Sequence, residues 1–160
     1  MSAKHKISVT LNGKKIEREV EPRLLLGDFL REEIGLLGVH HGCEQGVCGA
    51  CTILLNGDSV RACLMFAVQA DGAEITTVEG IGEPGNLHPL QQSFWDHHAL
   101  QCGFCTPGML LTSIDLIKKY PLENDEQIRH GLSGNICRCT GYQNIVTAVR
   151  EAAPGLRAAK

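Results

Sequence analysis

Eight cysteines are the residues of this 160-residue chain best suited to chemistry. Four is the number of thiolate ligands that one iron–sulfur cluster or one structural zinc takes. The chain begins without the apolar core of a secretion signal, so we expect thiols kept reduced and used for metal rather than disulfides. The cysteines fall into two groups of four along the chain, namely Cys43, Cys48, Cys51 and Cys63, then Cys102, Cys105, Cys137 and Cys139.

The first group has the spacing C-x4-C-x2-C followed by a more distant cysteine. This spacing is typical of plant-type 2Fe–2S ferredoxins. Three glycines lie among these ligands, at positions 42, 46 and 49. Glycine accepts positive φ and lets backbone N–H groups approach closely, so the loop can surround sulfide and thiolate acceptors.

A β-hairpin is expected to bring the fourth cysteine of this group back to the loop. Residues Thr52 to Leu55 are β-branched or apolar, and Asn56-Gly57 is a strong two-residue turn signal. A hairpin turning there places Cys51 almost opposite Cys63.

The second group has a different geometry, C-x2-C-x31-C-x-C. Thr106 and Pro107 are an expected N-cap and first helical residue, for a helix that runs to about Lys119. Cys105 would then lie at the positive end of a helix dipole, which favours a thiolate.

Two structural zinc sites are the main alternative, because each group contains one C-x2-C. Zinc fingers usually pair two such knuckles, so spacing favours iron–sulfur for the first group and leaves the second about even. A disulfide framework ranks third. Nucleophilic catalysis by cysteine is not expected, because two four-cysteine metal sites would use all eight thiols as ligands. We therefore predict no catalytic residue in this chain.

The remaining pattern predicts an α+β domain over 1–79, a turn-rich linker over 80–86 and a helical domain over 87–160. Within the first domain, alternating apolar residues predict a hairpin over 6–20, a helix over 24–34 and a strand over 74–78. Beyond the linker every periodic segment is helical, with helices expected over about 89–98, 107–119, 124–131 and 144–152.

Three further features receive structural interpretations. Residues 80–85 match G-x-G-x-x-G, but Pro84 and the missing βαβ context indicate a linker. The paired histidines His40, His41, His97 and His98 cannot share a helical face as ligands do, so we expect surface or loop positions. Trp95, beside Leu90 and Phe94, is expected in the core of the helical domain.

Charge and hydropathy exclude two classes of partner. Fifteen basic and eighteen acidic side chains leave a net charge of −3, so the chain has no excess of positive charge to attract nucleic acid. The longest apolar run, near residues 64–68, is far too short to span a membrane. With no leader expected, a cytoplasmic protein without membrane insertion is predicted.

Three motifs together resemble one known family. Residues 42–52 (GCEQGVCGACT), 101–108 (QCGFCTPG) and 137–142 (CRCTGY) are similar to the small iron–sulfur subunit of molybdenum hydroxylases, the xanthine dehydrogenase and carbon monoxide dehydrogenase family. The resemblance covers essentially the whole chain, with no departure at a ligand position.

The resemblance implies an N-terminal β-grasp, plant-type ferredoxin domain with the first 2Fe–2S cluster, then an all-α four-helix domain with the second. It also implies a heterotrimer, usually doubled, with a large molybdopterin subunit and a medium FAD subunit. Gln101 and Cys139 would face the pterin, and electrons would pass from molybdenum through the helical-domain cluster and the ferredoxin-domain cluster to FAD. Such enzymes hydroxylate their substrate in the large subunit, so this chain does not name the substrate.

Overall fold

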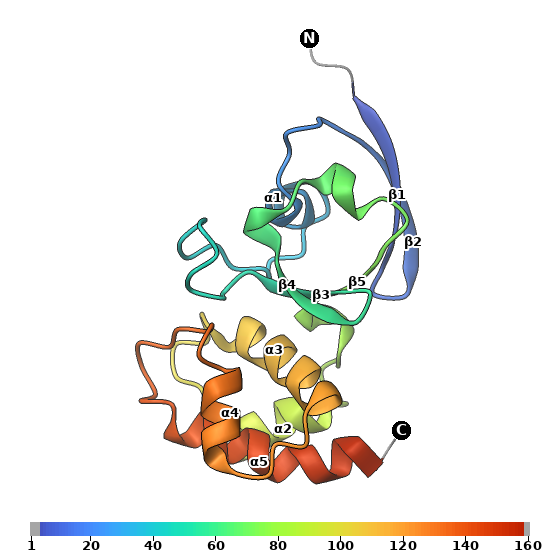
Figure 1. Cartoon of the computed structure of the whole chain (residues 1–160). Coiled ribbons are helices and arrows are strands. Elements are labelled where there is room, and N and C mark those ends of the chain that lie inside the picture. The colour runs from blue at the N-terminus through green and yellow to red at the C-terminus, as the bar shows by residue number, and fades with distance from the viewer. Residues whose placement is uncertain (1–3, 159–160) are drawn as a thin grey trace.

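The first half of the chain is built on a mixed five-stranded sheet, shown at the top of Figure 1 in the computed structural model, which describes residues 4–158. The strand order is β2-β1-β5-β3-β4, with β1 and β5 parallel and the other neighbours antiparallel. The strands are β1 (His5–Leu11), β2 (Lys14–Val20), β3 (Thr52–Leu55), β4 (Asp58–Arg61) and β5 (Glu74–Thr76).

The opening hairpin is confirmed. Alternate residues of β1, namely Ile7, Val9 and Leu11, are buried and face the core. Asn12 and Gly13 form the turn with φ of 48° and 77°, the left-handed region that a tight two-residue hairpin needs.

The helix expected over 24–34 is shorter and changes type. It begins as α1 (Leu26–Asp28) and continues as a π-helical turn over Phe29–Glu33. The N–H of Ile34 donates to the Phe29 carbonyl at 3.1 Å, a bond one residue longer than in an α-helix. The apolar face is retained, because Leu26, Phe29 and Leu30 are fully buried under the sheet.

The second half contains the helices α2 (Pro89–Asp96), α3 (Thr106–Lys119), α4 (Asp125–Gly131) and α5 (Gln143–Ala158), which share a second hydrophobic core. Asn124 is the N-cap of α4, since its side chain accepts from the Gln127 N–H at 3.0 Å. The Gln127 side chain bonds back to the N–H of Glu123 rather than of Asn124. Within residues 4–158, no helix combines the length and the apolar composition needed to cross a membrane.

The last helix is longer than the expected 144–152. Its apolar stripe does not stop at Val149 but continues through buried Ala153 to Leu156, which packs on the same core. Pro154 lies inside the helix on the exposed side and does not end it. The stabilisation from burying this apolar stripe therefore exceeds the cost of the backbone hydrogen bond that Pro154 cannot make.

The prediction that Trp95 lies in the core is wrong. Leu90 and Phe94, four residues apart, define the buried face of α2. Trp95 follows one residue later, about 100° further round the helix, and is 68% exposed.

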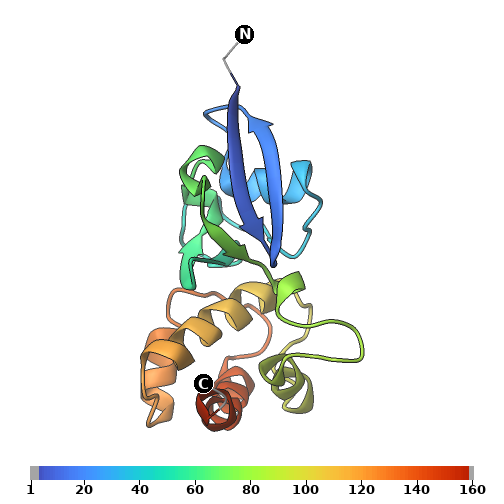
Figure 2. The same cartoon turned by 90° about the vertical axis from the view of Figure 1, so that its right-hand side faces the viewer.

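The two halves meet where α3 lies against β3 and β4, between the sheet and α5 (Figures 1 and 2). Buried Asp115 of α3 accepts hydrogen bonds from the N–H and hydroxyl of Ser59, at 3.2 and 2.7 Å. Lys119 contacts both Asp115 and Asp58 at 2.8 Å. Burial alone would raise the pKa of Asp115. Lys119 and Ser59 lower it by more than burial raises it, so the net shift is downward and this carboxylate stays charged at neutral pH.

Candidate metal centres

The first cysteine loop, residues 42–51, points backbone N–H groups at a thiol. The Cys48 N–H lies 3.3 Å from the Cys43 sulfur. This amide, with those of Gln45 and Val47, lowers the pKa of Cys43 to about 7. The loop therefore stabilises a thiolate, the form in which cysteine binds metal.

The predicted hairpin brings Cys51 and Cys63 together. Strands β3 and β4 pair in the expected register, with Thr52 opposite Arg61. The Ala62 N–H then donates to the Cys51 carbonyl at 3.2 Å, and the neighbouring Cys63 thiol contributes to the raised pKa of Cys51. Both cysteines are buried, and burial is the main cause that raises the pKa of Cys51 to about 11. A bound metal would hold such a thiol deprotonated.

The helix of the second group begins one residue earlier than predicted. Cys105 is itself the N-cap of α3, and Thr106 and Pro107 are its first two residues. Burial raises the pKa of Cys105 to about 12, with a further contribution from Cys137. The cysteine thus lies at the helix N-terminus as expected, but capping by the Thr106 side chain was wrong.

The loop after Cys137 holds this cysteine in place. Its sulfur lies 3.1 Å from the Thr140 hydroxyl, and its backbone N–H donates to the Tyr142 hydroxyl at 2.9 Å. Burial would raise the pKa of Cys137, but the hydroxyl and amide of Thr140 and the amide of Cys139 lower it overall. Sequence reasoning missed the roles of Thr140 and Tyr142, although both lie in the motif that follows the two cysteines.

Within each group of four, the thiols lie close enough to interact. The Cys102 and Cys139 sulfurs are 3.5 Å apart. Among residues 4–158, no three Cys, His, Asp or Glu side chains gather as ligands of a single ion would. A 2Fe–2S cluster takes two thiolates at each of its two irons, whereas a structural zinc site takes four ligands round one ion. Cys43 interacts with Cys48, Cys51 with Cys63 and Cys48, Cys105 with Cys137 and Cys102, and Cys139 with Cys102 and Cys137.

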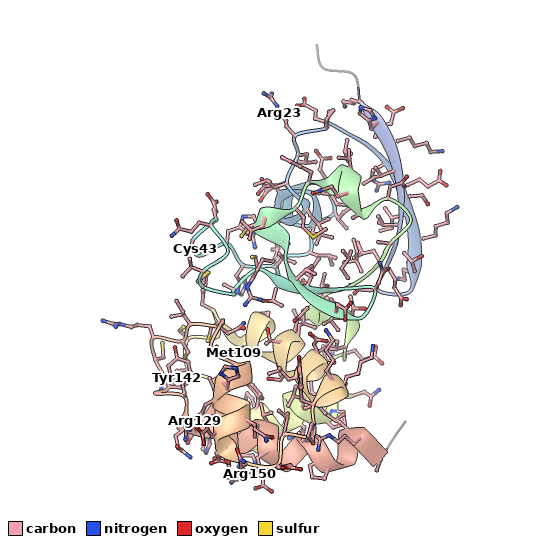
Figure 3. The ribbon with its side chains drawn as sticks, viewed as in Figure 1. Arg23, Cys43, Met109, Arg129, Tyr142 and Arg150 are labelled. Atoms are coloured by element: carbon pink, nitrogen blue, oxygen red, sulfur yellow. The ribbon has the colours of Figure 1, made fainter. Side chains whose placement is uncertain are left out.

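The two cysteine groups lie on the same side of the molecule. Figure 3 shows Cys43 on a loop of the sheet part and Tyr142 on the neighbouring loop of the helical part. The Ile136 N–H donates to the Cys48 carbonyl at 2.9 Å, so a residue next to Cys137 bonds directly to a residue of the first group. Short connections of this kind suit the passage of electrons between two centres.

A second contact between the loops involves a histidine. The His40 ring stacks on Phe104, with ring centroids 4.8 Å apart, and its Nδ1 lies 2.7 Å from the Phe104 carbonyl. His40 was expected only as a surface or loop residue, and its position in a loop is confirmed. His41 also lies in a loop, where its ring packs over Gly27 and faces Asp28 at 3.4 Å.

One rim of the second group is open to solvent. Gln101, Cys102 and Cys139 are all exposed. Two large apolar side chains, Phe104 and Ile136, are about half exposed beside them. Exposed apolar side chains next to thiols mark a surface able to pack against another protein.

Comparisons with known proteins agree with this geometry. Residues 9–76 match the 2Fe-2S iron-sulfur cluster binding domain, and residues 77–150 match the [2Fe-2S] binding domain. The gamma subunit of caffeine dehydrogenase from Pseudomonas sp. (strain CBB1) is 52% identical, with 98% of this chain and 95% of the relative covered. The nicotinate dehydrogenase small FeS subunit of Eubacterium barkeri is 50% identical, over 91% and 93%. A chain of quinoline 2-oxidoreductase from Pseudomonas putida 86 superimposes with a TM-score of 0.93 at 50% identity, over 98% of both chains.

Proposed function

This chain belongs to the small iron–sulfur subunits of the molybdenum hydroxylases, so it is an electron-transfer subunit, and from that premise we propose which cysteines hold its two 2Fe–2S clusters. The observation that carries the assignment is that the thiols of each group of four interact with one another. The first cluster is assigned to Cys43, Cys48, Cys51 and Cys63, and the second to Cys102, Cys105, Cys137 and Cys139.

When bound, each cluster stores one electron. The residues of this chain set its surroundings. The amides of the 42–51 loop favour thiolate at Cys43, and Thr140 does the same at Cys137. The burial of Cys51 and the partial burial of Cys105 shield the inner side of each centre from water. Both properties tune how readily a centre accepts an electron.

We assign residues 1–79 to a plant-type β-grasp ferredoxin domain, 80–86 to a linker and 87–160 to a four-helix 2Fe–2S domain. Support comes from two separate hydrophobic cores, one formed by residues 7–75 and the other by residues 90–153. Residues 1–3 and 159–160 lie outside the described part of the chain.

Catalysis takes place on a partner subunit, because the relatives are components of dehydrogenase complexes. We propose a heterotrimer, doubled in the complete enzyme, with a large molybdopterin subunit and a medium FAD subunit. Gln101 and Cys139 are assigned to the pterin-facing surface, since both are exposed beside half-exposed Phe104 and Ile136. The cytoplasm is the proposed compartment, where thiols remain reduced.

Replacing one proposed ligand tests the grouping. In the complex purified through a tag on this chain, Cys48→Ser should lower iron by about half, because only the first centre loses a ligand. The EPR signal of the second centre should persist, and a denaturing gel should show the two partner subunits. Val47→Ser is the matched control, as this neighbour is exposed and should keep all iron. Iron unchanged in Cys48→Ser would show that the ligands are wrongly grouped.

A further inference from the structure

Arg61, the last residue of β4, joins the two cysteine-bearing parts of the chain. Its Nη1 donates to the Thr52 hydroxyl at 2.6 Å, across the hairpin. Its Nη2 donates to the Gly134 carbonyl at 2.7 Å and lies 3.4 Å from Asn135 Oδ1, both in the helical part.

Every partner of this guanidinium is close in sequence to a cysteine. Thr52 follows Cys51 directly, and Arg61 itself lies two residues before Cys63. On the other side, Asn135 lies two residues before Cys137. The positive charge is therefore held between the two groups, next to the segments that carry ligands of each.

No carboxylate within residues 4–158 neutralises this charge. In that part of the chain Arg61 makes no ion pair with an Asp or Glu, whereas Arg150 contacts Asp125 at 2.9 Å. Its acceptors are a hydroxyl, a carbonyl and an amide oxygen, all neutral, and the side chain is only partly exposed. A guanidinium is charged at every accessible pH, so the site holds a fixed, uncompensated cation.

The structure assigns the missing countercharge to the metal centres, an inference that rests on the proposed ligand groups. A 2Fe–2S cluster with four thiolates is anionic, and one electron makes it more so. We propose that Arg61 raises the reduction potential of both clusters, and of the first more strongly, because two ligand-bearing segments of that group adjoin it. One electron then passes from the second cluster, which is oxidised, to the first cluster, which is reduced. The higher potential of the first cluster favours this step, and no proton is transferred.

Redox titration of the purified complex, followed by EPR, tests this role. In Arg61→Gln, the ratio of reduced to oxidised first cluster at a fixed potential should fall about tenfold. For a one-electron couple this corresponds to a reduction potential lowered by about 59 mV. Arg61→Lys keeps the charge and should stay within about twofold of wild type. Arg18→Gln is the control, since this exposed arginine of β2 donates to the carbonyl of its neighbour Glu17.

A relocated charge separates electrostatics from structure. A Cβ on Gly134 would lie 2.8 Å from Arg61 Nη2, so Gly134→Lys combined with Arg61→Gln attaches a flexible cation beside the position that the guanidinium occupies. Recovery of the potential in this double variant supports the proposal. Wild-type potentials in Arg61→Gln, or iron lost equally from the Gln and Lys variants, would overturn it. Failure of the proposed ligand groups can be told apart from failure of the Arg61 proposal. It would appear as an unchanged iron content in Cys48→Ser, whatever the potentials of the Arg61 variants.

Discussion

In the assembled complex, Cys43→Ser is expected to abolish turnover while substrate still reduces the second cluster. The helical part carries exposed Gln101 and Cys139, assigned to the pterin side, so the centre of the sheet part comes later in the sequence of carriers. Electron tunnelling falls steeply with distance, and a missing carrier cannot be bypassed at catalytic rates. Rapid-freeze EPR with substrate should show the second cluster reduced and the flavin still oxidised.

Cys105→Ser should give the complementary pattern. Damage to the second centre should leave reducing equivalents on molybdenum, with the first cluster oxidised. If the Cys105 variant still reduces its first cluster while the Cys43 variant fails to reduce its second, the order is reversed. The assignment of Gln101 and Cys139 to the pterin would then fall with it.

Gly108→Ala is expected to break the contact between the two parts of the molecule. A Cβ on this buried residue of α3 would overlap the Gly49 carbonyl oxygen, a backbone atom of the first cysteine loop. Because neither backbone can move without disturbing a cysteine group, we expect a loss of about 3 kcal/mol, near the upper end for overpacking. Thermal unfolding, followed by cluster absorbance, should show a midpoint lowered by roughly 6–12 °C.

Gly155→Ala is the matched control in another helix. Gly155 is exposed on α5, and a Cβ there would meet nothing within 4 Å. Alanine is favoured over glycine in a helix by about 1 kcal/mol, so the midpoint should stay unchanged or rise. A Gly108→Ala variant as stable as wild type would mean that α3 does not pack closely on Gly49.

Features set by neighbouring residues could be predicted from the sequence. The Asn-Gly turns at 12–13 and 56–57 fix both hairpins and their register, because only a few conformations suit a two-residue connection. The second of these turns is sufficient to predict that Cys51 lies beside Cys63. The α3 boundary was wrong by one residue, since cap geometry depends on backbone angles that composition leaves open.

Features set by residues far apart could not be predicted. Arg61 meets Gly134, and Asp115 meets Ser59, but neither pair has any local signal. The stacking of His40 on Phe104 depends likewise on how the two parts pack. Trp95 was misplaced because a helical pattern places an aromatic on a face only to within one residue. The contacts that hold the two groups together are therefore a property of the folded chain rather than of any short segment.

The metal and acid-labile sulfide content of the purified complex is the most direct test of the central claim that the eight cysteines form two 2Fe–2S centres. Each centre contains two irons and two sulfides, so we expect about four of each per chain, with negligible zinc. Two distinct EPR signals should appear on reduction, one from each group. Zinc near two per chain, without sulfide, would contradict the account and return these cysteines to structural zinc sites.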